Sequence, residues 1–352
     1  MDDRGRLQTL AAVLPEWYSA HRRDLPWRRD REPYHVWLSE IMLQQTRVEA
    51  VKGYYERFLS AVPDVPALAG ANPELLHKLW EGLGYYSRVR NLQAAAQQIM
   101  QEHGGVFPKD YASVRSLKGV GDYTAGAILS ICFEQPTPAV DGNVLRVVTR
   151  LNADPSPVTD EATKRSVREK LAEVYPAGKC GAFTQSLMEL GATVCLPNSE
   201  PRCGECPLAE FCLAHLRGSW RSYPVRSEKK PRRVEQLTVF VMECEGAFAL
   251  RKRAETGLLA GLWEFPNVPG HLDPQAALDQ AAEWGVHPRQ MQKTLERTHL
   301  FTHVEWRMRC VYLQCARQDP RFVWAAPMEL SQVYTLPTAF RMFRQDRLER
   351  SE

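Results

Sequence analysis

Four cysteines lie close together near the middle of the chain with the spacing C-x7-C-x2-C-x5-C: Cys195, Cys203, Cys206 and Cys212. Thiolates grouped this closely in a reducing compartment bind a metal ion or an iron–sulfur cluster. The charged N-terminus favours such a compartment and disfavours disulfides. Structural zinc is an alternative, but all-cysteine zinc sites prefer two closely spaced pairs. The spacing therefore favours a [4Fe–4S] cluster over zinc.

Two carboxylates stand in apolar surroundings. Glu40 is the only charged residue between His35 and Arg47, and Asp141 follows an apolar segment. A surface or capping role is the ordinary interpretation, and Asp141 is placed to cap a helix that starts near Asn143. However, a desolvated glutamate has a raised pKa and can donate a proton near neutral pH. With an ionised aspartate beside it, such an acid can cleave a glycosidic bond through an oxocarbenium-like transition state.

A possible phosphate-binding turn separates these two carboxylates. Gly119 and Gly121 lie two residues apart between helical stretches. Such a hairpin can direct backbone N–H groups at a phosphate, although a plain helix–helix turn is the alternative. Basic residues crowd positions 22–31 and 217–233, whereas the net charge of +3 gives only weak support for nucleic-acid binding.

The elements that position these residues differ between the two halves. Apolar periodicity predicts helices in the first half, over about 36–58, 72–80 and 85–103. In the second half, alternating apolar residues predict strands over 237–244, 248–253 and 303–315, and a helix is predicted over 275–284. We therefore expect a helical domain, a basic linker and a smaller α+β domain, over 1–220, 221–235 and 236–352. No apolar run approaches a membrane span, so a soluble protein with no membrane partner is expected.

Five motifs carry a resemblance to a known family: Leu25-Pro-Trp27, Trp37-Leu-Ser-Glu40-Ile-Met-Leu-Gln-Gln45-Thr46, Gly82-Leu-Gly-Tyr-Tyr86-Ser-Arg88, Gly119-Val-Gly-Asp-Tyr123-Thr-Ala125 and Val140-Asp141-Gly-Asn143-Val144. In them the chain resembles the adenine DNA glycosylases, the MutY branch of the endonuclease III-like superfamily. The resemblance covers nearly the whole chain. It implies a mainly α helix–hairpin–helix glycosylase fold with an iron–sulfur loop, followed by a C-terminal α+β Nudix-like domain.

The resemblance also implies a function. The family flips adenine out of duplex DNA, where it is mispaired with 8-oxoguanine or guanine, and hydrolyses its N-glycosidic bond. A monofunctional enzyme of base excision repair is therefore expected, monomeric, cytoplasmic and associated with the nucleoid.

Roles are implied for individual positions. Glu40 matches the acid that protonates the adenine ring, and Asp141 matches the carboxylate that stabilises the oxocarbenium ion, with support from Tyr123 and Asn143. The matches for DNA binding and duplex wedging are Gln45, Tyr85, Gly119 and Gly121, and the matches for the adenine pocket are Trp27, Arg28 and Gln185. The four cysteines match the ligands of the [4Fe–4S] cluster. The positions that match 8-oxoguanine recognition are Phe301, Thr302 and His303.

Two departures from the family pattern bear on these roles. The first cysteine gap holds seven residues where the family has six, which predicts a larger loop that keeps its cluster. Thr302 replaces the serine of a Phe-Ser-His reader; it keeps the hydroxyl and adds a methyl group.

The sequence disfavours three rival functions. A Nudix pyrophosphohydrolase needs a run of glutamates to hold Mg²⁺, and the helix over 275–284 offers only Asp279 and Glu283. A glycosylase with lyase activity needs an amine, and its lysine position holds Tyr123. A non-catalytic DNA-binding scaffold is disfavoured because Glu40 and Asp141 both stand in intact motifs.

Overall fold

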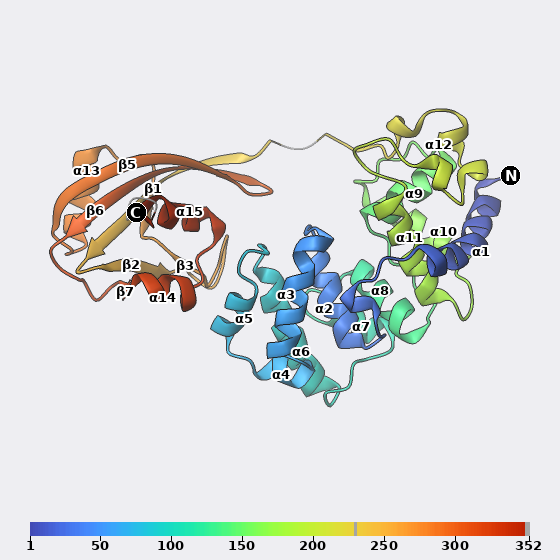
Figure 1. Ribbon diagram of the computed structural model, residues 1–352, viewed down its shortest axis with the longest axis horizontal. Coiled ribbons are helices and arrows are strands. Elements are labelled where there is room, and N and C mark those ends of the chain that lie inside the picture. The colour runs from blue at the N-terminus through green and yellow to red at the C-terminus, as the bar shows by residue number, and fades with distance from the viewer. Residues whose placement is uncertain (229–230, 349–352) are drawn as a thin grey trace. The chain divides into compact units, whose positions relative to one another are not determined.

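The computed structural model describes residues 1–228 and 231–348, and its chain divides into two compact units (Figure 1). The first comprises Met1–Gly70 and Asn91–Glu228, and the second comprises Ala71–Arg90 and Lys229–Glu352. Residues 229–230 of the expected linker and 349–352 of the expected second domain lie outside the described residues. No helix in the described ranges has the length and apolar character needed to cross a membrane.

The first unit is helical, as the sequence predicts. Its helices are α1 (Asp3–His21), α2 (Pro33–Leu43), α3 (Val48–Ala61), α4 (Val65–Gly70), α7 (Tyr111–Ser116), α8 (Asp122–Phe133), α9 (Gly142–Asn152), α10 (Glu161–Ala172), α11 (Cys180–Thr193) and α12 (Leu213–Leu216). A further helix, α6 (Ser87–Glu102), begins in the second unit and ends in the first. In Figure 1, α1, α9, α10 and α11 gather on the side of this unit that carries the N-terminus. They enclose a core that includes Leu10, Val148, Leu171 and Phe183.

The single helix expected over 36–58 is wrong in one respect. The chain forms two helices there, because α2 ends at Leu43 and α3 begins at Val48. Gln45 lies between them with a left-handed backbone, at φ 57°. An α-helix cannot continue through that conformation, whereas apolar periodicity on both sides of a short break still reads as one helix.

A hairpin joins α7 to α8 as expected. Gly119 has φ 78°, and a Cβ atom there would lie 2.7 Å from Cβ of Asn91. Both the backbone angle and this close approach require glycine. Gly121 is the N-cap of α8, with an extended backbone. The turn therefore has a defined shape and ends at the start of a twelve-residue helix.

The second unit contains a mixed sheet with helices on both faces. Its elements are α5 (Pro73–Leu79), β1 (Arg233–Cys244), β2 (Ala247–Lys252), β3 (Trp263–Glu264), β4 (Asn267–Pro269), α13 (Pro274–Glu283), β5 (Pro288–Leu300), β6 (Val304–Cys315), β7 (Val323–Ala325), α14 (Pro327–Gln332) and α15 (Thr338–Leu348). The order along the main path is β3-β2-β1-β6-β5, with β1 and β6 parallel. Strand β1 begins inside the range expected to be linker.

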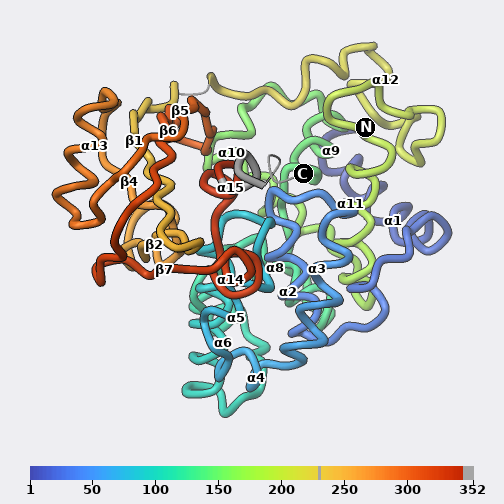
Figure 2. The backbone as a smooth tube through the Cα atoms, turned by 60° about the vertical axis from the view of Figure 1, so that its left-hand side comes forward, coloured from blue at the N-terminus to red at the C-terminus, as the bar shows by residue number. Residues whose placement is uncertain are grey.

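Alternation along the central strands places apolar side chains on both faces of this sheet. On β1, Val239 and Val241 join the core that includes Phe340 of α15, whereas Phe240 and Met242 join the core that includes Ala277 of α13. Figures 1 and 2 show α13 on one face and α15 on the other. The strands and the helix expected in this half are confirmed, but β5 was missed because every second residue along it is exposed and few of its side chains are apolar.

Candidate active site

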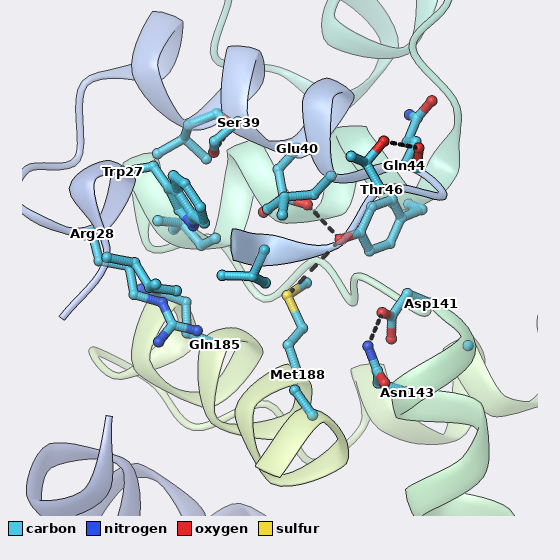
Figure 3. Close-up of a pocket in the computed structure, with 18 of the residues that line it drawn as sticks. Trp27, Arg28, Ser39, Glu40, Gln44, Thr46, Asp141, Asn143, Gln185 and Met188 are labelled. Atoms are coloured by element: carbon cyan, nitrogen blue, oxygen red, sulfur yellow. Dashed lines mark hydrogen bonds between the residues drawn. The ribbon is translucent and has the colours of Figure 1, made fainter. Parts of the chain in front are cut away.

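A cavity of about 560 Å³ opens in the first unit (Figure 3). Side chains from α2, α8, α9 and α11 line it, together with the 3-10 turn Pro26–Arg28. Eight residues singled out from the sequence line this one cavity: Trp27, Arg28, Glu40, Gln45, Tyr123, Asp141, Asn143 and Gln185. Segments more than 150 residues apart in the sequence thus meet at one place, since Trp27 and Gln185 share this wall.

Glu40 has the environment expected of a proton donor. Its side chain is in helix α2 and only 7% of the residue is exposed. The hydroxyl of Tyr123 donates a hydrogen bond to its Oε2 atom. Burial, with a contribution from the charge of Asp141, raises the pKa of Glu40 to about 7, against opposing effects of Tyr123 and Arg28. Near neutral pH the carboxyl is therefore partly protonated and able to donate.

Asp141 caps a helix and lines the cavity. Its Oδ1 atom accepts a hydrogen bond from the backbone N–H of Val144 at 2.8 Å, which confirms the expected N-cap of α9. Its Oδ2 atom accepts one from Nδ2 of Asn143 at 2.7 Å. Burial raises the pKa of Asp141, and these two hydrogen bonds oppose the rise because they stabilise the ionised form. Figure 3 shows Glu40 and Asp141 carried by different elements around the cavity.

Arg146 links this site to the cysteine loop. Its Nη2 atom donates to Oδ1 of Asn143 at 2.8 Å and to the carbonyl of Gly191 at 2.7 Å. Its Nε atom donates to the carbonyl of Cys195 at 2.7 Å. Asn143 is thus held between Arg146 and Asp141. Arg146 was not predicted from the sequence, although a charged residue inside the apolar run of α9 was a usable signal.

The wall opposite α9 is built from aromatic and polar side chains. The Trp27 ring packs edge-on against Tyr55, with centroids 5.6 Å apart. Gln185 accepts a hydrogen bond at Oε1 from the hydroxyl of Tyr18 at 2.9 Å. Met188 was not predicted either; it lines the cavity, and its sulfur lies 3.9 Å from the Tyr123 hydroxyl.

The four cysteines line a second, smaller cavity of about 30 Å³ together with Arg150 and Trp220. Arg150 donates a hydrogen bond from Nη1 to Sγ of Cys195 at 3.3 Å. Burial raises the pKa of the Cys206 thiol to about 12, so a positive group is needed to make it a thiolate. Within the described ranges, no three histidine, cysteine, aspartate or glutamate side chains are already arranged to hold a metal ion.

The additional residue in the first cysteine gap is accommodated in an exposed loop. The N–H groups of Leu196 and Arg202 both donate to the carbonyl of Val194, at 3.0 and 2.9 Å. These bonds close the loop at its base, and residues 197–200 between them are exposed. Cys195 and Cys203 consequently line the same cavity despite the seven-residue gap.

The expected DNA-binding residues fall in both units. At the end of the hairpin, Asp122 accepts a hydrogen bond from Nε of Arg115 at 2.7 Å and pairs with Arg168 at 2.9 Å, so two arginines lie beside the turn. Gln45 lines the large cavity. Tyr85 belongs to the second unit, where its side chain is exposed and its backbone is left-handed at φ 48°. Left-handed backbones at non-glycine residues are costly and concentrate at functional sites.

The expected reader residues lie at the turn between β5 and β6. The Phe301 ring is anchored edge-on against His299 and Trp306, with centroids 4.5 and 4.8 Å away. Thr302 and His303 are exposed beside it. In the same unit, the hydroxyls of Thr302 and Tyr85 lie 2.8 Å apart.

Fold and site together define a class. Residues 38–176 match the family of HhH-GPD superfamily base excision DNA repair proteins, and residues 238–345 match the NUDIX domain family. Among solved structures, a thermostable thymine-DNA glycosylase is 25% identical with a TM-score of 0.55, over 60% of this chain and 98% of that one. An endonuclease III–DNA complex, 23% identical with a TM-score of 0.51, shares the fold.

Curated relatives narrow the class further. The adenine DNA glycosylase of Homo sapiens is 37% identical over 90% of this chain and 69% of its own. That of Rattus norvegicus is 35% identical over 87% and 70%, and that of Buchnera aphidicola from Acyrthosiphon pisum is 31% identical over 83% and 82%. The chain belongs to the adenine DNA glycosylase family. It is thus a DNA-binding enzyme of the hydrolase class, as the motifs predicted.

Proposed function

We propose that this protein hydrolyses the N-glycosidic bond of adenine mispaired with 8-oxoguanine or guanine in duplex DNA. The observation that carries the proposal is the pairing of Glu40, whose pKa is near 7, with the hydrogen-bonded carboxylate of Asp141 in one cavity. Glu40 protonates the adenine ring, and the bond between C1′ and the base breaks. Asp141 stabilises the positive charge that develops on the sugar. Water adds at C1′ and loses a proton, which restores the acid form of Glu40, and adenine and an abasic site are released.

The cavity suits a base that has left the stack. Trp27 supplies an aromatic wall, and Arg28 and Gln185 supply hydrogen-bonding groups. Unstacking a base costs a few kcal/mol, which inserted side chains and a fitted pocket offset. Gln45 and Tyr85 are the proposed wedges, and the N–H groups of Gly119 and Gly121 bind the phosphate backbone. We assign this chemistry to residues 1–220, lesion reading to 236–352, and the linker to 221–235; the active form is a monomer.

A cleavage assay tests this proposal. Duplexes with adenine opposite 8-oxoguanine, guanine or thymine are incubated with excess protein, and strand scission is measured before and after alkali. Excision is expected opposite 8-oxoguanine and guanine, not opposite thymine. Scission should require alkali, because the Tyr123 hydroxyl cannot form the imine that a lyase needs. Borohydride trapping of a covalent protein–DNA complex, or loss of adenine opposite thymine alone, would contradict the proposal.

The cysteine loop supports a second part of the proposal, a resident [4Fe–4S] cluster held by Cys195, Cys203, Cys206 and Cys212. Their shared cavity and the Arg150 donor suit a group with anionic sulfur ligands. When bound, the cluster would keep the loop in one conformation. Arg146 donates hydrogen bonds both to the carbonyl of Cys195 and to Asn143, so it connects the loop to the large cavity.

Metal analysis tests the cluster. Protein purified without oxygen is expected to be brown and to contain about four irons and four sulfides per chain. Cys206→Ser should lower that content and weaken binding to lesion DNA, because the loop loses its anchor. Cys244→Ser is the control, since Cys244 is buried in the other unit. Stoichiometric zinc without iron or sulfide would overturn the assignment.

The third part assigns 8-oxoguanine recognition to Phe301, Thr302 and His303. Phe301 is anchored by two aromatic rings, and Thr302 and His303 beside it are exposed, with the Thr302 hydroxyl in contact with that of Tyr85. Helix α13 carries only two carboxylates, Asp279 and Glu283, which are too few to hold Mg²⁺ and so favour recognition over hydrolysis.

Removal of one hydroxyl tests this assignment. Thr302→Val keeps the shape of the side chain and should cost about 1 kcal/mol of affinity for the 8-oxoguanine duplex, and little for the guanine duplex. The measurement is the ratio of affinities and single-turnover rates on the two duplexes. Thr298→Val, at an exposed position of the adjoining strand, is the matched control. An unchanged ratio for Thr302→Val would remove Thr302 from lesion recognition.

A further inference from the structure

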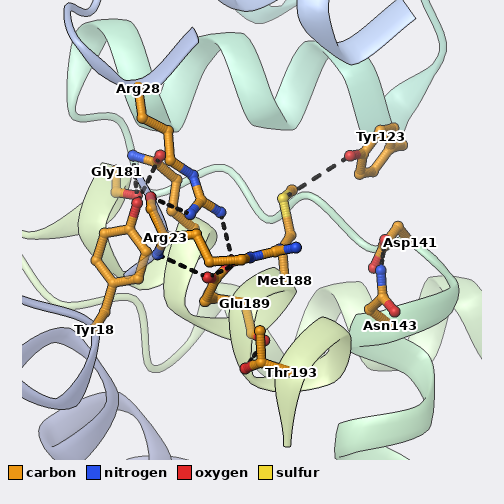
Figure 4. Close-up of polar contacts among 11 residues, drawn as sticks. Tyr18, Arg23, Arg28, Tyr123, Asp141, Asn143, Gly181, Met188, Glu189 and Thr193 are labelled. Atoms are coloured by element: carbon orange, nitrogen blue, oxygen red, sulfur yellow. Dashed lines mark hydrogen bonds and ion pairs between the residues drawn. The ribbon is translucent and has the colours of Figure 1, made fainter. Parts of the chain in front are cut away.

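A carboxylate that the proposed mechanism does not use lies behind the wall of the large cavity. Glu189, on α11, is fully buried, with 0% of the residue exposed. Its Oε1 atom accepts hydrogen bonds from the backbone N–H of Arg23 at 3.0 Å and from Nε of Arg23 at 2.8 Å. Its Oε2 atom accepts from Nη2 of Arg23 and Nη2 of Arg28, both at 2.8 Å. Figure 4 shows both arginines converging on this one side chain.

The two arginines keep this buried carboxylate ionised. Burial acts to raise the pKa of Glu189, but the hydrogen bonds from Arg23 and Arg28, with the charge of Arg28, hold it at about 2. A carboxylate that titrates so far below neutral pH does not move protons in a reaction near pH 7. Its contribution must therefore come through the groups it holds.

Both arginines line the cavity, and Arg28 is the one assigned to the proposed adenine pocket. Arg28 is fixed at Nη2 by Glu189, its Nη1 atom lies 3.4 Å from the carbonyl of Arg23, and its guanidinium lies 5.4 Å from the centre of the Tyr18 ring. The hydroxyl of Tyr18 in turn donates to Oε1 of Gln185. Arg28 and Gln185, the two polar groups of the proposed adenine pocket, are thus held from behind by one network.

We propose that Glu189 is a positioning residue for adenine excision, which fixes the guanidinium of Arg28 at the cavity wall and so sets the orientation of the extruded base. The inference rests on the proposed function. A planar guanidinium held at Nη2 by a carboxylate is restricted in its orientation, and its remaining N–H groups can face a planar ligand. Without that partner the side chain would sample several rotamers, and the C1′–base bond would be misaligned with Glu40 and Asp141.

The main test separates positioning from folding. Glu189→Gln removes the charge and one acceptor at nearly unchanged volume. We expect its single-turnover rate on adenine opposite 8-oxoguanine to fall about 100-fold, as a misplacement of about 1 Å does. Its affinity for a duplex with a tetrahydrofuran abasic analogue opposite 8-oxoguanine should stay within about twofold, because that duplex carries no base for Arg28 to orient. Thr193→Val is the matched control, because its hydroxyl bonds the backbone carbonyl of Glu189 and not the carboxylate.

A double-mutant cycle shows whether the effect passes through Arg28. Arg28→Gln should lower the rate by a similar factor, and Glu189→Gln should cost little more in that background. If the rate decrease of the double variant equals the product of the two single decreases, Glu189 acts independently of Arg28 and the inference is contradicted. Wild-type excision by folded Glu189→Gln would also overturn it.

A conservative variant keeps the inference testable if Glu189→Gln does not fold. Glu189→Asp retains the buried charge, but its shorter side chain cannot hold both arginines in place. Its melting midpoint should stay near that of the wild type while its rate falls about 10-fold, and a wild-type rate would contradict the inference. If the wild type does not excise adenine, both the proposed function and this inference are wrong. If the wild type and the Glu189 variants excise adenine equally fast, the inference alone is wrong.

Discussion

Glu40→Gln is expected to lower the rate of adenine release by about 10²–10⁴-fold, the usual contribution of a positioned general acid. The amide occupies the same space and can still accept the hydrogen bond from Tyr123, but it cannot deliver a proton to the adenine ring. The measurement is single-turnover excision from duplexes with adenine opposite 8-oxoguanine. Affinity for the same duplex should stay close to that of the wild type. Glu49→Gln, which removes an exposed carboxylate paired with Lys52, is the control.

The pH profile of the wild type gives an independent view of the same group. The folded pKa of Glu40 is raised to about 7, so its acid form is fully present below that pH and is lost as the pH rises through it. Excision should therefore decline on the alkaline side with a midpoint near 7. Asp141 must be ionised, and its raised pKa moves the acidic decline above the ordinary aspartate range. The residual activity of Glu40→Gln should lack the alkaline decline; if it keeps that decline, another group is the acid.

The parts of the site that were predictable from sequence share one property. Glu40, Tyr123 and Asp141 each stand in a short motif, and the motifs together predicted that the three side chains meet at one site. Their convergence on one cavity follows from helices whose apolar faces were visible as periodicity. The left-handed backbone at Gln45 could not be predicted from the sequence, because glycine, and not glutamine, is the residue that usually adopts this conformation.

Long-range polar pairing was the main feature that sequence could not supply. Glu189 meets Arg23 across 166 positions, and Arg146 meets the carbonyl of Cys195 across 49. A lone charge in the apolar run around Glu189 resembles the signal that drew attention to Glu40. That signal shows that a charge is buried, but it does not show which partner satisfies it. The partner is fixed only when α1, α9 and α11 pack together.

Asp141→Asn is expected to separate two roles of one side chain. Asparagine is as good an N-cap as aspartate, so its Oδ1 atom can keep the hydrogen bond from Val144. Its amide nitrogen, however, faces Nδ2 of Asn143, which is itself a donor. Because Arg146 donates a hydrogen bond to Oδ1 of Asn143, the Asn143 amide cannot turn over to present its oxygen to the new donor. The free energy of unfolding should fall by about 1–3 kcal/mol, the cost of a buried unsatisfied donor.

The loss of activity in Asp141→Asn should be far larger than this change in stability implies. A neutral amide cannot balance the positive charge that develops on the sugar, and removal of one such electrostatic contact lowers rates by about 10²–10³-fold. Single-turnover excision is measured well below the melting midpoint of the variant, so that unfolded protein does not contribute. Asp273→Asn is the matched control, because Asp273 caps α13 through the N–H of Ala276 at 2.8 Å in the other unit. If Asp141→Asn excises adenine as fast as Asp273→Asn does, then Asp141 is a helix cap alone, and the charge that stabilises the sugar must come from elsewhere in the cavity.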